Sequence, residues 1–373
     1  MRKVYLDANS NYGLLPSVRE AIKDCPDLGN PNSLHFYGQT LKALIEETRE
    51  TVRKFFRLPV EYNIYFCSGA TEAANWLSYS MSKSGKKVLT SKVEHACVIE
   101  SLRLWIERCN LIEIPVNYSC DSLFEDFKNR LPVNIQEFGF LVWMHSHNET
   151  GVIFPLKEYT DAIKKANPSI RLVCDAVQSI CKVENFQPDL FDAFFISGHK
   201  IGALPGVGVL VTKPDFPLFP MIVGGSQEKY MRAGTESYQA IFSLKKALEF
   251  WQNCNGYEVI FKSKKEYLKN ALINRLGEKA IFYFEKFSTV PNTLHVSFPG
   301  HKSSDLLVAL DLKGICCSAG SSCYSGKPLP PSLEGFLMPP EISKTVLRLS
   351  FRLDISQDDL EYAAEKISEV VNY

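Results

Sequence analysis

The sequence lacks several features that would place it in a specialised class of protein. Its 42 basic and 42 acidic residues cancel, and no block of basic residues stands out as a binding arm. A chain without an overall positive field has no general attraction for nucleic acid, so we expect no direct nucleic-acid partner. No apolar run approaches the length of a bilayer span, and residues 1–7 lack the organisation of a secretory signal. We therefore expect a cytoplasmic protein without a membrane partner.

The cysteines lack the spacing of a disulfide framework. Eleven of them are scattered through apparent strands and helices, which is typical of reduced thiols in a reducing compartment. The adjacent Cys316 and Cys317 do not have the paired spacing of metal ligands, and the His145-x-His147 pair supplies only two ligands. We expect no metal site. Repeats and low-complexity segments are also missing, and the composition, 45% hydrophobic and 23% charged, is that of an ordinary soluble enzyme.

The order of apolar runs indicates the fold. Helical patterns alternate with short strand-like runs at 64–66, 87–90, 111–115, 138–144, 170–175, 194–197 and 208–211. Such alternation predicts crossover units, and so a mostly parallel sheet covered by helices on both faces. At 373 residues the chain is longer than the commonest compact unit, so two domains are expected.

A second domain is expected after about residue 250. Helical periodicity at 239–254 and at 261–276 marks the passage to it, and strands are predicted at 292–298 and 346–351, joined by an N-terminal strand at 1–7. The segment 318–340 is dense in Gly, Ser and Pro and is predicted to be a loop. Cys323 lies in this loop, where an exposed and mobile thiol suits a nucleophile; a structural cysteine is the alternative.

Lys200 ends the stretch Ser197-Gly198-His199-Lys200, between an apolar strand and a glycine-rich turn. A lysine held out of bulk water there can lose its proton and form an imine with an aldehyde cofactor. About 25 residues earlier, Asp175 ends another strand, at the edge where open α/β sheets bind ligands. A carboxylate beside a pyridinium nitrogen keeps that ring electron-withdrawing, so the pair predicts pyridoxal 5′-phosphate. A surface turn and a loop cap are their ordinary alternatives.

The turn 67–71 lies between a strand-like run and the start of a helical pattern. This arrangement offers free backbone N–H groups and the positive end of a helix dipole to a phosphate. Ala70 and Thr71 are therefore candidate phosphate contacts. Small residues open many helices, so the turn alone is weak evidence.

Taken together, the motifs give the chain a resemblance to cysteine desulfurases of the NifS/IscS group, within the class V aminotransferase family of fold type I pyridoxal phosphate enzymes. The resemblance runs nearly from end to end. It rests on Tyr5-Leu6-Asp7, Gly29 to Ser33, Ser68 to Glu72, Glu94-His95, Asn148 to Gly151, Asp175 to Gln178, Ser197 to Lys200, Arg232 to Thr235, Gly320 to Cys323 and Leu347 to Ser350. So many motifs in compatible order make coincidence a poor explanation.

The resemblance implies both a fold and an activity. The fold is an α/β, fold type I PLP-dependent transferase, with a large domain at 13–250 that carries a mostly parallel seven-stranded sheet. A smaller α+β domain is formed by 1–12 and 251–373 and carries the cysteine loop. The implied activity converts L-cysteine to L-alanine and leaves a persulfide on Cys323, from which the sulfur passes to an acceptor protein.

Roles for individual residues also follow from the resemblance. Lys200, Cys323 and His95 are implied to be catalytic, and Arg348 and Asn148 to bind the substrate. Thr235 is implied to reach the cofactor phosphate across a homodimer interface. The implied cofactor-binding set is Ala70, Thr71, His95, Asn148, Asp175, Gln178, Ser197, His199, Lys200 and Thr235.

Departures from the family pattern leave other readings open. They fall at 9–12, 147, 203–204 and 351–352, and they bear on the shape of the substrate pocket. Residues 224–228 and 232–236 also resemble selenocysteine lyase, and a non-catalytic scaffold in a sulfur-transfer complex is a second alternative. An aminotransferase would give Cys323 no task. The sequence does not choose among acceptors in iron–sulfur cluster assembly, tRNA thiolation or DNA sulfur modification.

Overall fold

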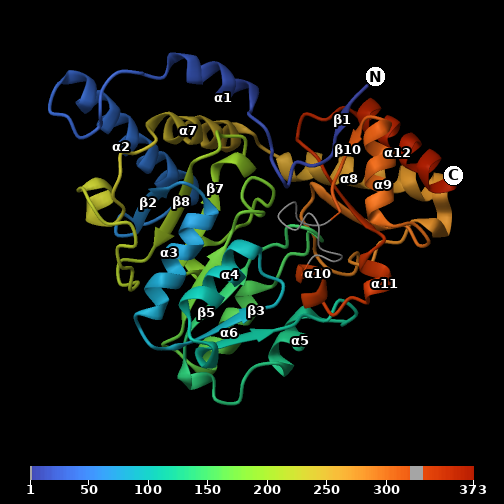
Figure 1. Ribbon diagram of the computed structural model, residues 1–373, viewed down its shortest axis with the longest axis horizontal. Helices are drawn as coiled ribbons and strands as arrows, with labels where there is room; N and C mark the ends of the chain where they lie inside the picture. Colours follow the sequence, from blue (N-terminus) through green and yellow to red (C-terminus); the bar gives the residue numbers. More distant parts are fainter. Residues whose placement is uncertain (1, 320–330) are drawn as a thin grey trace.

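The structure is a computed structural model, and it describes residues 2–319 and 331–373 (Figure 1). Its larger part is built on a seven-stranded sheet with the spatial order β2-β8-β7-β6-β5-β3-β4. Strand β8 pairs antiparallel with β2 and β7, and the other neighbours are parallel. The predicted α/β class with a mostly parallel sheet is confirmed. The bounds are β2 (Asn63–Cys67), β3 (Lys87–Ser91), β4 (Leu111–Ile114), β5 (Phe138–Met144), β6 (Arg171–Asp175), β7 (Ala193–Ser197) and β8 (Gly208–Thr212).

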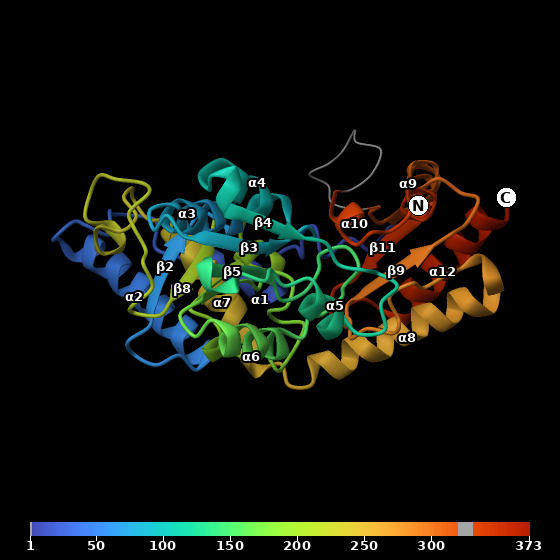
Figure 2. The same cartoon turned by 90° about the horizontal axis from the view of Figure 1, so that it is seen from below.

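Helices cover both faces of this sheet (Figure 2). Helices α3 (Ala70–Ser82) and α4 (Ala96–Trp105) lie on one face, and α2 (Phe36–Phe56), α6 (Leu156–Ala166) and α7 (Tyr238–Asn253) lie on the other. Neighbouring strand residues therefore belong to different cores: Phe195 packs in the cluster of α3 and α4, and Phe194 packs in the cluster that includes α2 and α7. Because both faces are covered, the strands read as continuous apolar runs, and every residue of β7 is buried.

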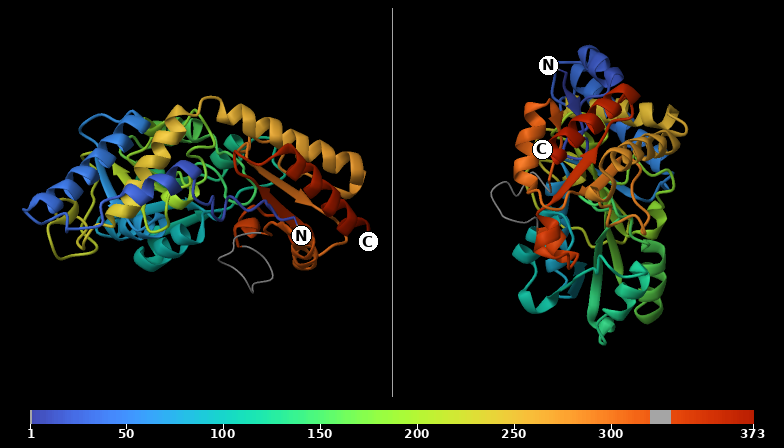
Figure 3. Two further views of the ribbon diagram at one scale, coloured as in Figure 1. Left: turned by 90° about the horizontal axis from the view of Figure 1, so that it is seen from above. Right: turned by 90° about the vertical axis from the view of Figure 1, so that its right-hand side faces the viewer.

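A smaller part of the molecule carries both chain termini beside α12 (Figure 3). Here β9 and β11 pair antiparallel and β1 and β10 pair parallel, so an N-terminal strand lies among C-terminal elements. The domain limits predicted at 12/13 and 250/251 stay predictions. The elements are β1 (Val4–Tyr5), α8 (Tyr257–Leu276), β9 (Thr293–Ser297), α9 (Ser303–Leu312), β10 (Ile315–Cys316), α10 (Pro331–Gly335), α11 (Pro340–Ser343), β11 (Val346–Ser350) and α12 (Gln357–Asn372). Helices α1 (Pro16–Ala21) and α5 (Leu123–Asn129) complete the larger part.

The prediction of one loop over 318–340 is wrong in its second half. Helix α10 begins at Pro331 and α11 begins at Pro340. Proline is favoured in the first helical turn, because its fixed φ suits the helix and its missing N–H would have no intrahelical partner there. The prolines that suggested a loop therefore begin two short helices. Cys323 lies outside the described residues.

Among the helices that the structure describes, none is both long enough and apolar enough to cross a bilayer.

Candidate active site

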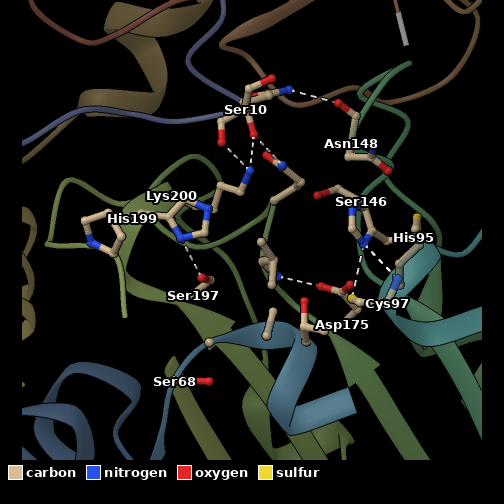
Figure 4. A pocket seen from close by; sticks show the side chains of 18 of the residues that line it. Ser10, Ser68, His95, Cys97, Ser146, Asn148, Asp175, Ser197, His199 and Lys200 are labelled. Atoms are coloured by element: carbon tan, nitrogen blue, oxygen red, sulfur yellow. Dashed lines mark hydrogen bonds between the residues drawn. The ribbon is translucent and has the colours of Figure 1, made fainter. Parts of the chain in front are cut away.

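A cavity of about 430 Å³ lies where the carboxyl ends of β2, β5, β6 and β7 meet (Figure 4). This is the edge at which open α/β sheets bind ligands. The cavity brings together motifs that are far apart in the sequence. Of the predicted site residues, its lining includes Ala70, Thr71, His95, Asn148, Asp175, Gln178, Ser197, His199, Lys200 and Arg348.

Lys200 enters the cavity from the short 3₁₀ turn that follows β7. Its Nζ donates hydrogen bonds to the backbone oxygens of Asn9 at 2.7 Å and Ser10 at 2.6 Å. Figure 4 shows the amine directed at Ser10. The segment after β1 therefore holds this lysine in place, and the amine stays within reach of a molecule in the cavity.

Asp175 ends β6 and is only 6% exposed. Its Oδ1 accepts a hydrogen bond from the Val177 N–H at 2.9 Å. Burial raises the pKa of this carboxyl to about 6, although the Val177 N–H and the Lys200 charge act in the opposite direction. A protonated ring nitrogen facing the carboxylate would stabilise its ionised form.

His95 is the N-cap of α4, and its Nδ1 accepts a hydrogen bond from the Cys97 N–H at 3.2 Å. Because Nδ1 accepts, the proton of the neutral ring is on Nε2. Burial, assisted by the charges of Lys200 and Arg348, lowers the pKa of His95 to about 4. At neutral pH the ring is thus uncharged, so it can lie against another ring and exchange a proton.

The start of α3 forms one end of the cavity. Ala70 and Thr71 lie in the first turn of this helix, whose backbone N–H groups have no intrahelical acceptor. Ser197 Oγ and His199 Nδ1 lie 2.9 Å apart at the same cavity. Free N–H groups, a positive helix end and a hydroxyl form a suitable cradle for a phosphate.

Gly208 of β8 lets the turn before α3 lie close against the sheet. A Cβ atom at this position would come within 2.6 Å of the Gly69 Cα, a separation that side chains do not tolerate. Only glycine allows this approach.

Arg348 lies on β11 and is only 2% exposed, so it is a buried residue and not part of a surface ion pair. Its guanidinium donates to Asp7 Oδ1 at 2.6 Å, to Ser10 Oγ at 2.7 Å and to the Asn148 backbone oxygen at 2.9 Å. Within the described ranges, Arg348 Nε and Asn148 Oδ1 are buried without a hydrogen-bond partner. Buried polar atoms are rarely left unpaired, which indicates a ligand here.

The structure also identifies residues that the sequence analysis did not assign to the site. The backbone oxygen of Asn9 accepts from Gln178 Nε2 at 3.1 Å as well as from Lys200. Lys182 donates to Gln178 Oε1 and to Asn9 Oδ1, and it is 1% exposed. A charged residue in the otherwise apolar stretch 180–183 was the available signal for Lys182. The cavity lining also includes Ser10, Cys97 and Ser146.

Thr235 does not line this cavity. It is exposed and lines a smaller neighbouring cavity of about 130 Å³, which shares Ser68 and Gly206 with the larger one. Arg232 holds the segment near the start of α3, because its guanidinium donates to the Glu72 carboxylate at 2.8 and 3.0 Å. A single chain does not test the donation of Thr235 to a second subunit, which stays a prediction.

In the His145-x-His147 pair, Nδ1 of each ring has a hydrogen-bond partner. His145 Nδ1 lies 2.7 Å from Ser179 Oγ, and His147 Nδ1 lies 3.0 Å from Thr150 Oγ1. In the part of the chain that the structure describes, no group of three or more His, Cys, Asp or Glu side chains is placed to hold a metal ion.

Comparisons with known proteins agree with this geometry. The family model described as Aminotransferase class-V matches residues 4–362. The cysteine desulfurase IscS of Dictyoglomus turgidum is 30% identical to this chain, over 99% of this chain and 95% of its own length. The cysteine desulfurase IscS of Clostridium botulinum is 31% identical, over 99% of this chain and 94% of its own length. Among solved structures, a NifS-like protein from Rickettsia africae covers 100% of both chains at 25% identity with a TM-score of 0.87.

Proposed function

The chain belongs to the aminotransferase class-V family, and on the basis of its site we propose that it is a pyridoxal-phosphate-dependent cysteine desulfurase. It converts L-cysteine to L-alanine and retains the sulfur as a persulfide on Cys323. One observation supports this most: a strand-end lysine, a buried carboxylate and a free helix start surround one cavity, with a buried arginine beside them.

The residues of the cavity fit pyridoxal 5′-phosphate. Ala70, Thr71, Ser197 and His199 would hold the phosphate, and Asp175 would pair with the ring nitrogen. When bound, this cofactor supplies an electron sink for the charge that develops at the substrate Cα. The remaining proposed contacts are Asn148 and Gln178 at the ring oxygen, His95 against the ring face and Lys200 as the covalent attachment.

The other steps depend on side chains of this chain. Arg348 lines the cavity and would offer its guanidinium to the substrate carboxylate, and Asn148 borders the same place. Lys200 removes the proton from Cα and returns it during turnover, and the neutral His95 assists proton transfer. The Cys323 thiolate would form an S–S bond to the substrate sulfur while the Cβ–S bond breaks. The electron pair of the broken bond stays with the carbon skeleton, which takes up a proton at Cβ, so the amino acid leaves as alanine. A sulfur-acceptor protein then removes the sulfur from Cys323.

A homodimer is part of the proposal, with Thr235 of one subunit reaching the phosphate of the other. Residues 31–32 and 226–229 line a common cavity. Large apolar side chains are exposed on the same two segments of the chain: Leu34 is 92% exposed, Phe36 77%, Val223 79% and Tyr230 73%. Both segments lie at the left of Figures 1 and 2. An exposed apolar patch of this kind supports a protein interface.

A cytoplasmic location without nucleic-acid or membrane partners is proposed together with the homodimer.

The activity is tested with the purified protein, pyridoxal phosphate and L-cysteine. We expect alanine release and one persulfide per subunit. The Cys323→Ala variant should keep the visible cofactor band and form no persulfide, whereas Cys25→Ala, which removes a buried thiol remote from the cavity, should behave as the wild type. Persulfide formation by Cys323→Ala contradicts the assignment. Alanine release from selenocysteine alone would instead identify a selenocysteine lyase.

A further inference from the structure

Lys182 is a buried lysine that the proposed chemistry does not use. It is 1% exposed, and its Nζ donates to Gln178 Oε1 and, at 3.3 Å, to Asn9 Oδ1. Both acceptors are uncharged. Within residues 2–319 and 331–373, no carboxylate lies within ion-pair distance of this amine.

Folding alone does not explain a lysine at this position. Burying an ammonium group without a counter-ion costs free energy, and the positive charges of Lys200 and Arg348 add to that cost. These effects lower the pKa of Lys182 well below its ordinary value. An apolar side chain of similar length would be more stable here, so the amine has another task.

Gln178 shows what that task is. Its amide has one acceptor oxygen and two N–H donors. Lys182 donates to the oxygen, and one N–H donates to the Asn9 backbone oxygen at 3.1 Å. The second N–H remains for a molecule in the cavity, which Gln178 lines. Turning the amide by 180° would set its oxygen against the Asn9 backbone oxygen, which is a repulsive contact, and would take away the oxygen to which Lys182 donates.

We propose that Lys182 is a positioning residue: it fixes the Gln178 amide so that its remaining N–H, and not its oxygen, faces the ring oxygen of the bound cofactor. This inference rests on the proposed function, because it assumes the cofactor in this cavity. Asn9 completes the arrangement, since its backbone oxygen accepts from both Gln178 and Lys200 and its side chain accepts from Lys182.

The arrangement has a spectroscopic consequence. An N–H donated to the ring oxygen stabilises the anionic form of that oxygen and so favours loss of the proton that the bound cofactor shares with Lys200. The pH-dependent colour change of the loaded enzyme then has a lower midpoint. Without Lys182, the Gln178 donor is no longer fixed, and the midpoint should rise by about one pH unit, the usual size of a single hydrogen-bond effect.

The test compares absorbance titrations of the wild type, Lys182→Met and Lys265→Met, each loaded with pyridoxal phosphate. Lys265 is a matched control, because its amine donates to Thr289 Oγ1 at 2.6 Å and to the Val290 oxygen at 3.2 Å, away from this cavity. We expect a raised midpoint for Lys182→Met and an unchanged midpoint for Lys265→Met. An unchanged midpoint for Lys182→Met overturns the inference.

A double-mutant cycle separates positioning from a simple loss of charge. If Lys182 acts through Gln178, the Lys182→Met change should have no further effect in a Gln178→Ala background. A shift that persists in that background shows that the amine acts directly on the cofactor, and the proposal is then wrong.

Failure of the inference is distinguishable from failure of the proposed function. A wild-type protein that develops no visible band with pyridoxal phosphate contradicts the function itself. Should Lys182→Met not fold, a neutron crystal structure of the loaded wild type, which locates the hydrogens of the Gln178 amide, decides the matter. Gln178 Nε2 within about 3.2 Å of the ring oxygen supports the proposal, and Gln178 Oε1 in that place overturns it.

Discussion

Among single residues, Asp175 shows how a buried charged group of the site lowers the stability of the fold. The folded chain holds its carboxyl in a buried place that raises the pKa from 3.8 to about 6. The folded state therefore binds this proton more tightly than the unfolded state does. Its contribution to stability is fully present below pH 3.8 and is lost as the pH rises through about 6. At neutral pH, without cofactor, the charged side chain destabilises the fold.

The Asp175→Asn variant should accordingly stabilise the cofactor-free protein at pH 7.5 by about 3 kcal/mol, since the pKa rises from 3.8 to about 6 and one pKa unit corresponds to about 1.4 kcal/mol. Asparagine keeps the acceptor for the Val177 N–H and removes the charge. Urea unfolding at pH 7.5 and pH 4 measures the effect, which should vanish at the lower pH. A variant less stable than the wild type at pH 7.5 contradicts this account. The same variant should bind pyridoxal phosphate more weakly.

At the scale of elements, the sequence predicted what depends on local pattern. All the apolar runs expected as strands of the large sheet form β2 to β8, because strands buried on both faces are continuously apolar. The site residues at strand ends were predictable for the same reason. The Lys182–Asn9 contact was not, since it joins residues 173 positions apart and depends on how β1 meets the large sheet. The proline and glycine residues between 318 and 340 predicted a loop, but two short helices begin in this segment.

Helix α4 provides a prediction at this scale. His95 caps its first turn through Nδ1, so one side chain both begins the helix and lines the cavity. His95→Asn keeps a favourable N-cap and His95→Ala does not, and the alanine variant should be about 1 kcal/mol less stable than the asparagine variant. Both should lose catalytic proton transfer. Urea unfolding of the cofactor-free variants measures the difference, and equal stabilities would show that the cap contributes nothing.

For the whole molecule, buried histidines should make the fold sensitive to acid. Burial lowers the pKa of His95, His145, His147, His199 and His295 below 6.5. The unfolded chain binds these protons more tightly, so stability is lost as the pH falls from 6.5 toward 4. Buried Glu94 and Asp175, whose pKa values are raised to about 8 and about 6, act in the opposite direction but are fewer. The urea midpoint of the cofactor-free protein should fall steadily from pH 6.5 to pH 5. A constant midpoint over this range contradicts the prediction.

The proposed homodimer is tested by mixing two inactive variants. Thr235→Ala lacks the donated hydroxyl, and Lys200→Ala lacks the amine. In a hybrid dimer, the site with an intact Lys200 receives Thr235 from the other subunit, so mixing after subunit exchange should restore alanine release. If Thr235 served its own chain, the mixture would be no more active than its parts. Lys200→Ala mixed with wild type is the control for exchange.

The central claim is that Lys200, and no other lysine, carries the cofactor. Lys182 approaches the same cavity through Gln178 and Asn9, so the two amines are the relevant alternatives. The most direct measurement is borohydride reduction of the protein loaded with pyridoxal phosphate, followed by peptide mass spectrometry. The account predicts a pyridoxyl group on Lys200 and an unmodified Lys182. A label on Lys182, or no label on either lysine, would contradict it.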